Sequence, residues 1–141
     1  MTTRLAANGI VCLPGVGFLG SKFVAVDFLG APRCFPTGPA SLARASDAVL
    51  LPFFNFVAAD GTERIVIEEP LPVTASGDDG VVECVTRYAR LLERYVRRYP
   101  EQWPRWHDSP VASVAECRGH VLSAGRRSPS WRAGPDRSPS S

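Results

Sequence analysis

The segment Ala31 to Pro39 carries the clearest set of residues for binding a ligand. The run Thr37-Gly38-Pro39-Ala40 is typical of a helix start, where Thr caps the first turn and Pro fits without loss of a hydrogen bond. A helix N-terminus offers free N–H groups and a positive dipole end, which suit a phosphate. Arg33 could add a charge-assisted contact, Thr37 a hydroxyl donor, and Gly38 room for a ligand near the backbone. We therefore predict phosphate binding by Arg33, Thr37 and Gly38; the alternative is a capped helix with a solvent-facing arginine.

A second candidate is a stripe of arginines on a long helix predicted over residues 78–99. At about 100° per residue, the stripe falls opposite an apolar face and consists of Arg87, Arg90, Arg94, Arg97 and Arg98. Glu83 and Glu93 stand four residues before two of these arginines, a spacing that favours ion pairs. The stripe is either a solvated charged face or a contact surface for anionic lipid or an acidic carrier protein.

Residues for catalysis or metal binding are scarce. The chain has two histidines, His107 and His120, and no carboxylate pair, glycine-rich phosphate loop or metal-ligand cluster with convincing spacing. The four cysteines form no Cys-x-x-Cys pair, and we expect reduced thiols. The residues by themselves therefore predict no catalytic group, no metal and no cofactor.

The elements that must position these residues alternate between strand and helix. Strands are predicted over 10–13, 23–28, 48–57 and 63–69, with a hairpin turn at Asp60-Gly61. The nearly continuous apolar run 48–57 is typical of a central strand covered on both faces. Helices are predicted over 37–47 and 78–99, with a short one from Pro100 whose Trp103 and Trp106 dock onto the body. This order predicts an α/β fold with a mixed sheet of about four strands flanked by helices.

The composition of the chain argues against several classes of protein. The 141 residues carry a net charge of +2, which gives no case for nucleic-acid binding, and no apolar stretch is long enough to span a membrane. We expect one body over residues 1–116 and a disordered Ser/Pro/Arg-rich tail over 117–141, because the tail has little to bury. The tail repeats Arg-Ser-Pro-Ser, and an RNA-binding role for it is the alternative.

Five motifs, in this order and spacing, resemble the C-terminal half of the bacterial lipid A biosynthesis acyltransferases, which belong to the lysophospholipid acyltransferase superfamily. They are Phe28-Leu29-Gly30, Phe35-Pro36-Thr37-Gly38-Pro39-Ala40, Leu42-Ala43, Ala48-Val49-Leu50-Leu51-Pro52, and Tyr99-Pro100-Glu101-Gln102-Trp103 with Trp106-His107. The resemblance implies transfer of a fatty acyl group from acyl carrier protein or acyl-CoA to a glycolipid, at the cytoplasmic face of the bacterial inner membrane. It also implies that the Thr37 segment helps to hold the phosphate-bearing headgroup of the acceptor.

The chain departs from the family at its catalytic motif. Members of the family use a His followed, after four intervening residues, by Asp or Glu, and the His deprotonates the acceptor hydroxyl. The corresponding positions after His107 and His120 are Ala112 and Gly125. We therefore expect a C-terminal portion of an acyltransferase domain that is inactive alone, with the missing N-terminal half as a possible partner and no cofactor beyond the acyl donor. The alternatives are a non-catalytic module that binds anionic lipid or carrier protein, and a pseudogene product that does not fold stably.

Overall fold

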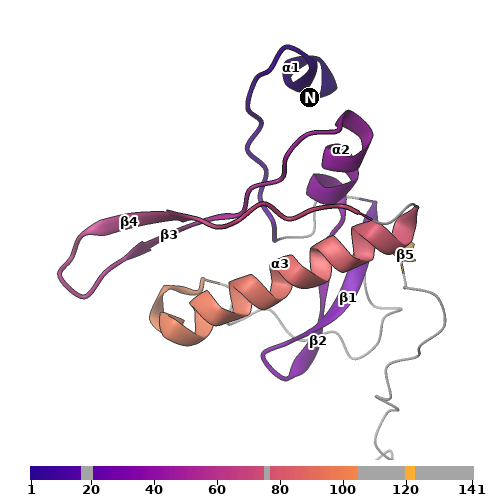
Figure 1. The fold of residues 1–141 in the computed structure, drawn as a ribbon. Helices are drawn as coiled ribbons and strands as arrows, with labels where there is room; N and C mark the ends of the chain where they lie inside the picture. Colours follow the sequence, from indigo (N-terminus) through magenta and orange to yellow (C-terminus); the bar gives the residue numbers. More distant parts are fainter. Residues whose placement is uncertain (17–20, 75–76, 105–119, 123–141) are drawn as a thin grey trace, which may run out of the picture.

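A computed structural model of the chain describes residues 1–16, 21–74, 77–104 and the backbone of 120–122 (Figure 1). In chain order the elements are α1 (Thr2–Ala6), β1 (Lys22–Phe28), β2 (Ala31–Pro36), α2 (Gly38–Ser46), β3 (Phe53–Val57), β4 (Glu63–Ile67), α3 (Asp78–Arg98), the 3-10 turn η1 (Pro100–Gln102) and β5 (His120–Leu122). Helices and strands mix as predicted, so the α/β class is confirmed.

The described strands form two small sheets, whereas the sequence predicted one mixed sheet. The first has the order β2-β1-β5, with β1 antiparallel to β2 and parallel to β5. The second is the β3–β4 hairpin alone. β5 lies within the tail predicted to be disordered; the rest of that tail, like Trp106 and His107, lies outside the described residues.

The hairpin of β1 and β2 adds a strand over 31–36, where the sequence analysis predicted none. Leu29 and Gly30 both have positive φ angles, 55° and 81°, as the two-residue turn of a type I′ hairpin requires. β2 contains Pro32 and Pro36, which cannot donate to a ladder and are typical of a strand at a sheet edge. β2 is such an edge, because its neighbour in the described residues is β1 alone.

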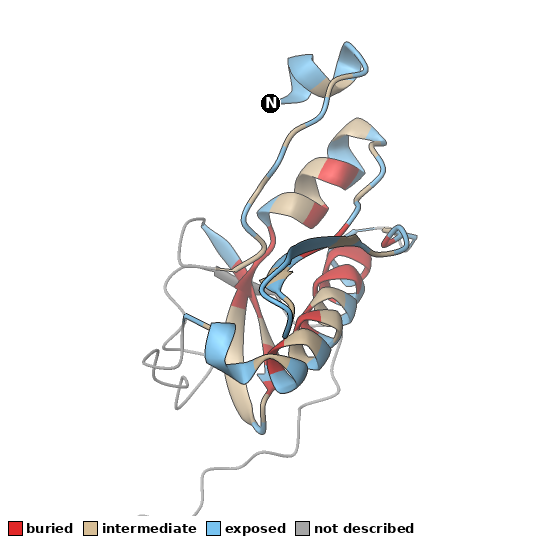
Figure 2. Ribbon diagram, turned by 90° about the vertical axis from the view of Figure 1, so that its left-hand side faces the viewer, coloured by how far each residue is buried: buried red, intermediate tan, exposed pale blue. Residues whose placement is uncertain are grey.

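The core lies between α3 and the first sheet. Phe28 and Val24 on β1 and Phe35 on β2 are buried against the apolar face of α3. The buried red positions of α3 turn toward β1 in Figure 2. α3 begins at Asp78, carries acidic residues in its first turn and arginines in its last, and ends just before Pro100, all of which suit a helix. The predicted helix over 78–99 is confirmed.

One predicted strand does not form, and another is shorter than predicted. No strand forms over 10–13, where the Ile10 side chain is 88% exposed, because a short apolar run becomes a strand only when another strand pairs with it. The strand predicted over 48–57 covers 53–57, and one of its faces is left open. The Asp60-Gly61 turn is confirmed: Gly61 has a φ of 80°, and Asp60 accepts a hydrogen bond of 3.0 Å from the Thr62 N–H. That bond holds the pKa of Asp60 below its ordinary value.

The η1 turn and the residue that follows it contact both the β3–β4 hairpin and the core. Gln102 uses its side-chain amide as a strand partner for Val57: Oε1 accepts from the Val57 N–H and Nε2 donates to the Val57 carbonyl, both at 2.7 Å. The adjacent Trp103 packs beside Phe28, with ring centroids 5.8 Å apart. The prediction that Trp103 docks onto the body is confirmed. Among the described residues, no helix combines the length and the apolar content needed to cross a bilayer.

Candidate functional site

Thr37 occupies the start of α2, as predicted, but its hydroxyl is turned toward β1. The residue is only 3% exposed, and its Oγ1 donates to the Lys22 carbonyl at 3.2 Å. The Thr37 N–H donates to the same carbonyl at 3.1 Å, and no side-chain cap hydrogen bond forms on α2. Thr37 therefore fixes the start of the helix to the sheet. Gly38, next in the chain, is exposed and has open space where a side chain would be.

Arg33 lies away from this helix start. It pairs with Val26 in the β1–β2 ladder, and its Cζ sits 6.0 Å from the centre of the Phe28 ring. At about 3.3 Å per strand residue, the four residues from Arg33 to Thr37 correspond to about 13 Å. The structure thus does not bring Arg33 together with Thr37 and Gly38. Phosphate binding by the three residues stays a prediction.

The arginine stripe of α3 is brought beside a second segment, and the two form an open groove. Arg87, Arg90, Arg94 and Arg97 line one wall, and the segment 68–71 after β4 lines the other, around a volume of about 890 Å³. We call this the arginine groove. Arg98 lies outside it and approaches the Tyr99 ring, with its Cζ 5.6 Å from the ring centre.

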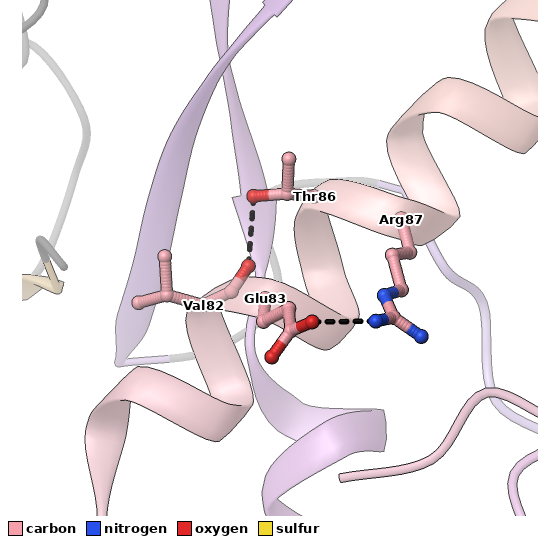
Figure 3. A network of polar contacts seen from close by, with 4 residues as sticks. All are labelled: Val82, Glu83, Thr86 and Arg87. Carbon is pink, nitrogen blue, oxygen red and sulfur yellow. Dashed lines mark hydrogen bonds and ion pairs between the residues drawn. The ribbon is translucent and has the colours of Figure 1, made fainter. Parts of the chain in front are cut away.

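Charges in the arginine groove are partly neutralised. Glu83 pairs with Arg87 at 2.5 Å, as Figure 3 shows, and Glu93 pairs with Arg97 at 2.5 Å. Both pairs have the predicted i,i+4 spacing. These are exposed pairs, so each contributes at most about 0.5 kcal/mol. These two pairs neutralise Arg87 and Arg97, and they leave Arg90 and Arg94 as the other arginines that line the groove.

Arg90 and Arg94 form no ion pair with any carboxylate of the described residues. They stand one helical turn apart, so their guanidinium groups can reach the same ligand. A guanidinium binds carboxylate or phosphate through paired, charge-assisted hydrogen bonds. This half of the groove is therefore able to hold an anion, and Glu68 and Glu69 on the facing wall restrict where that anion can lie.

Tyr95 contacts Glu68 in the facing wall of the groove, and the sequence analysis did not predict this contact. Its hydroxyl donates to Glu68 Oε1 at 2.6 Å, and its ring stacks on Phe54 with centroids 4.2 Å apart. Burial, then the bond to Glu68, raises the pKa of Tyr95 to about 12, so the hydroxyl stays protonated and can donate. A tyrosine on the apolar face of a predicted helix needs a partner for its hydroxyl, and this was the signal available.

The described cysteines show no reactive thiol built into a site. Cys84 is buried in the core, where burial raises the pKa of its thiol, and Cys12 is an exposed free thiol. Cys34 is disulfide-bonded, which contradicts the expectation that all thiols are reduced. Among the described residues, no group of three His, Cys, Asp or Glu side chains could hold a metal ion.

Comparison with known proteins places this sequence in a family. The sequence model of the bacterial lipid A biosynthesis acyltransferases matches residues 1–108. A phosphatidylinositol mannoside acyltransferase of Mycobacterium tuberculosis is 30% identical over 118 residues, 84% of this chain and 36% of the relative. Its counterpart from a second strain is 31% identical over 115 residues, 82% of this chain and 35% of the relative. The chain thus spans about a third of the length of these relatives. It belongs to the family of bacterial lipid A biosynthesis acyltransferases.

Proposed function

We propose that the chain is part of an enzyme that transfers a fatty acyl group from acyl carrier protein or acyl-CoA to a hydroxyl of a glycolipid. The observation that carries the proposal is the family match over residues 1–108, together with two relatives named for acylating a phosphatidylinositol mannoside. Lipid A precursors and phosphatidylinositol mannosides are the acceptor classes that these names point to. The proposed place of action is the cytoplasmic face of the inner membrane.

In this proposal the chain supplies binding groups, and the base that acyl transfer needs is supplied from outside the chain. Acyl transfer needs a base to take the proton from the acceptor hydroxyl while its oxygen attacks the thioester carbon and the thiolate leaves. The chain carries no His with a carboxylate at the family spacing, so we expect no turnover by the chain alone. Its proposed contribution is binding: Arg90 and Arg94, which line the arginine groove, hold an anionic group, and the headgroup phosphate lies at the start of α2 beside the exposed Gly38.

A chimaera tests the transferase proposal directly. Residues 1–108 of this chain replace the matched third of the M. tuberculosis relative, and acyl transfer to a phosphatidylinositol mannoside acceptor is measured from acyl-CoA and acyl carrier protein. We expect transfer by the chimaera and none by the isolated chain. A chimaera that folds, as judged by circular dichroism, but transfers nothing would contradict the proposal. So would turnover by the isolated chain that His107→Ala abolishes.

A second candidate function, binding to anionic lipid or to an acidic carrier protein, is favoured by Arg90 and Arg94, which form no ion pair within the described part of the chain. An arginine near an anionic surface contributes about 1 kcal/mol, so Arg90→Gln with Arg94→Gln should weaken binding to phosphatidylserine-containing vesicles by about thirtyfold at low salt. The matched control is Arg4→Gln with Arg64→Gln, which removes the same charge outside the arginine groove. Equal loss in both double variants would assign the binding to net charge.

A further inference from the structure

The arginine groove has a basic wall and an acidic wall that face each other. On the basic wall, Arg90 and Arg94 are exposed and form no ion pair with the described residues. On the acidic wall, Glu69 is exposed and likewise forms no ion pair in the described part of the chain, and Glu68 accepts the hydrogen bond from Tyr95. The two i,i+4 ion pairs account for the other charged side chains of the lining, which are Arg87, Glu93 and Arg97. The groove thus presents positive charge on one side and negative charge on the other.

Both walls are held in place by contacts within the chain. The Glu68 N–H donates to the Pro52 carbonyl at 2.9 Å, which fixes the acidic wall to the segment before β3. The Leu71 N–H donates to the Leu50 carbonyl at the same distance. The basic wall is part of α3, whose apolar face is buried in the core. A groove with fixed walls binds without the entropy cost of ordering a loop, so its charge pattern selects what fits.

The length of the basic wall favours an extended occupant. The wall from Arg87 to Arg97 is about 15 Å long at 1.5 Å per helical residue. The lining also includes the apolar side chains of Pro70, Leu71 and Leu91. An amphipathic helix combines length, an apolar strip and charged flanks, and a helix laid in a groove is a recurring mode of protein recognition.

The opposite signs of the two walls favour a helix over an anionic membrane. A bilayer rich in anionic lipid presents one sign of charge, so it attracts Arg90 and Arg94 but repels Glu68 and Glu69 across the groove. A helix is about 10–12 Å across and can carry carboxylates along one side and lysines along the other. Two carboxylates four residues apart on such a helix lie one turn apart, which is the spacing of Arg90 and Arg94.

We propose that the arginine groove docks an acidic amphipathic helix of a partner protein, with carboxylates on Arg90 and Arg94 and a non-acidic side toward Glu68 and Glu69. The inference rests on the proposed function, in which acyl carrier protein is the protein partner that brings the acyl group. It gives the groove a part in recognising the donor and none in the chemistry. Each guanidinium can bind a carboxylate through paired, charge-assisted hydrogen bonds.

Fluorescence anisotropy with the full chain tests the docking. Two stapled helical peptides serve as probes; both carry two glutamates four residues apart on one side, and the opposite side carries lysines in peptide A and glutamates in peptide B. We expect saturable binding of acyl carrier protein and of peptide A, and weaker binding of peptide B. Arg90→Glu with Arg94→Glu should weaken peptide A about tenfold or more, and lysines in place of its two glutamates should restore binding. The matched control is Arg4→Glu with Arg64→Glu, which makes the same change in charge outside the groove.

Glu69→Lys tests the orientation of the bound helix. The substitution reverses one charge of the acidic wall, so the variant should bind peptide B more tightly than peptide A. The matched control is Glu63→Lys, an exposed glutamate outside the groove, which should keep the preference for peptide A. Circular dichroism checks that each variant folds, and Arg90→Gln with Arg94→Gln serves if the charge reversal disturbs α3.

Three results would overturn the docking proposal. They are no saturable binding of peptide A or acyl carrier protein, equal effects in the groove variants and their controls, and loss of binding to phosphatidylserine-containing vesicles in the charge-reversal variant while peptide A binds unchanged. The last result would assign the groove to a membrane. In an active chimaera, charge reversal should raise KM for acyl carrier protein about tenfold and leave KM for acyl-CoA unchanged. A full chain that binds peptide A while the chimaera transfers nothing would support docking and count against the proposed activity, so the two failures are distinguishable.

Discussion

The hydrogen bond from Tyr95 to Glu68 should stabilise the fold, and Tyr95→Phe isolates it. The substitution removes the hydroxyl that donates at 2.6 Å and keeps the ring that stacks on Phe54. A hydrogen bond to a charged acceptor contributes about 1.5–3 kcal/mol in proteins. Both side chains are half-buried here, and solvent screening lowers the expected loss to about 1 kcal/mol.

The same contact makes the stability depend on pH in a defined direction. The pKa of Tyr95 rises from an ordinary value of 10.0 to about 12 on folding, because burial and the bond to Glu68 favour the protonated phenol. A group whose pKa is raised in the folded state contributes its full stability below pH 10 and loses it as pH rises through 12. About half of the contribution is gone by pH 11, midway between the two values.

Urea unfolding followed by tryptophan fluorescence measures this difference at pH 8 and pH 11. We expect the variant to lose about 1 kcal/mol at pH 8 with an unchanged urea slope, and the gap to the unaltered protein to narrow to about half at pH 11. Tyr88, whose pKa burial also raises to about 12, titrates in both proteins and drops out of the comparison. A variant as stable as the unaltered protein at pH 8, or a gap that does not change with pH, would refute the reasoning.

Gly15→Ala should destabilise the fold by about 1–3 kcal/mol, because a Cβ there would overlap the hydroxyl of Tyr88, whereas Gly38→Ala, which meets open space, should change the melting temperature little. Equal effects of the two substitutions in thermal melts would count against this packing. The thiol of Cys84 is 1% exposed with a pKa raised by burial, so peptide mapping should find it unlabelled by a thiol reagent in native buffer while Cys12 is labelled within minutes. Labelling of both at one rate would show that the core opens readily.

The sequence predicted correctly the elements whose ends are marked by residues close to them in the chain. α3 combines a 3.6-residue apolar period, acidic residues at its start, arginines at its end and a proline beyond it, and these agree with one another. The start of α2 at Thr37 and the turn at Asp60-Gly61 rest on backbone preferences that act within a few residues. The ion pairs of Glu83 and Glu93 follow from helical spacing alone.

The candidate sites were predicted less well, because they depend on contacts between distant segments. No strand was predicted over 31–36, whereas the pairing with β1 makes this segment an edge strand and places Arg33 opposite Val26, four residues along the chain from Thr37. The predicted arginine stripe became one wall of a groove only when Tyr95 held Glu68 across from it. The pattern of 48–57 indicated a strand with two covered faces, and the structure shows which of them is covered by α3.

The sequence by itself determined the α/β class, the long arginine-bearing helix and the absence of a His-carboxylate pair at the family spacing, since each depends on residue type and near spacing. Among the described residues, tertiary structure decided that the strands form two sheets, that Arg90 and Arg94 remain without carboxylate partners, and that Ile65 and Ile67 on the outer face of the β3–β4 hairpin are exposed. The physical reason is that strand pairing and groove walls join residues far apart in the chain, whose approach no local period encodes.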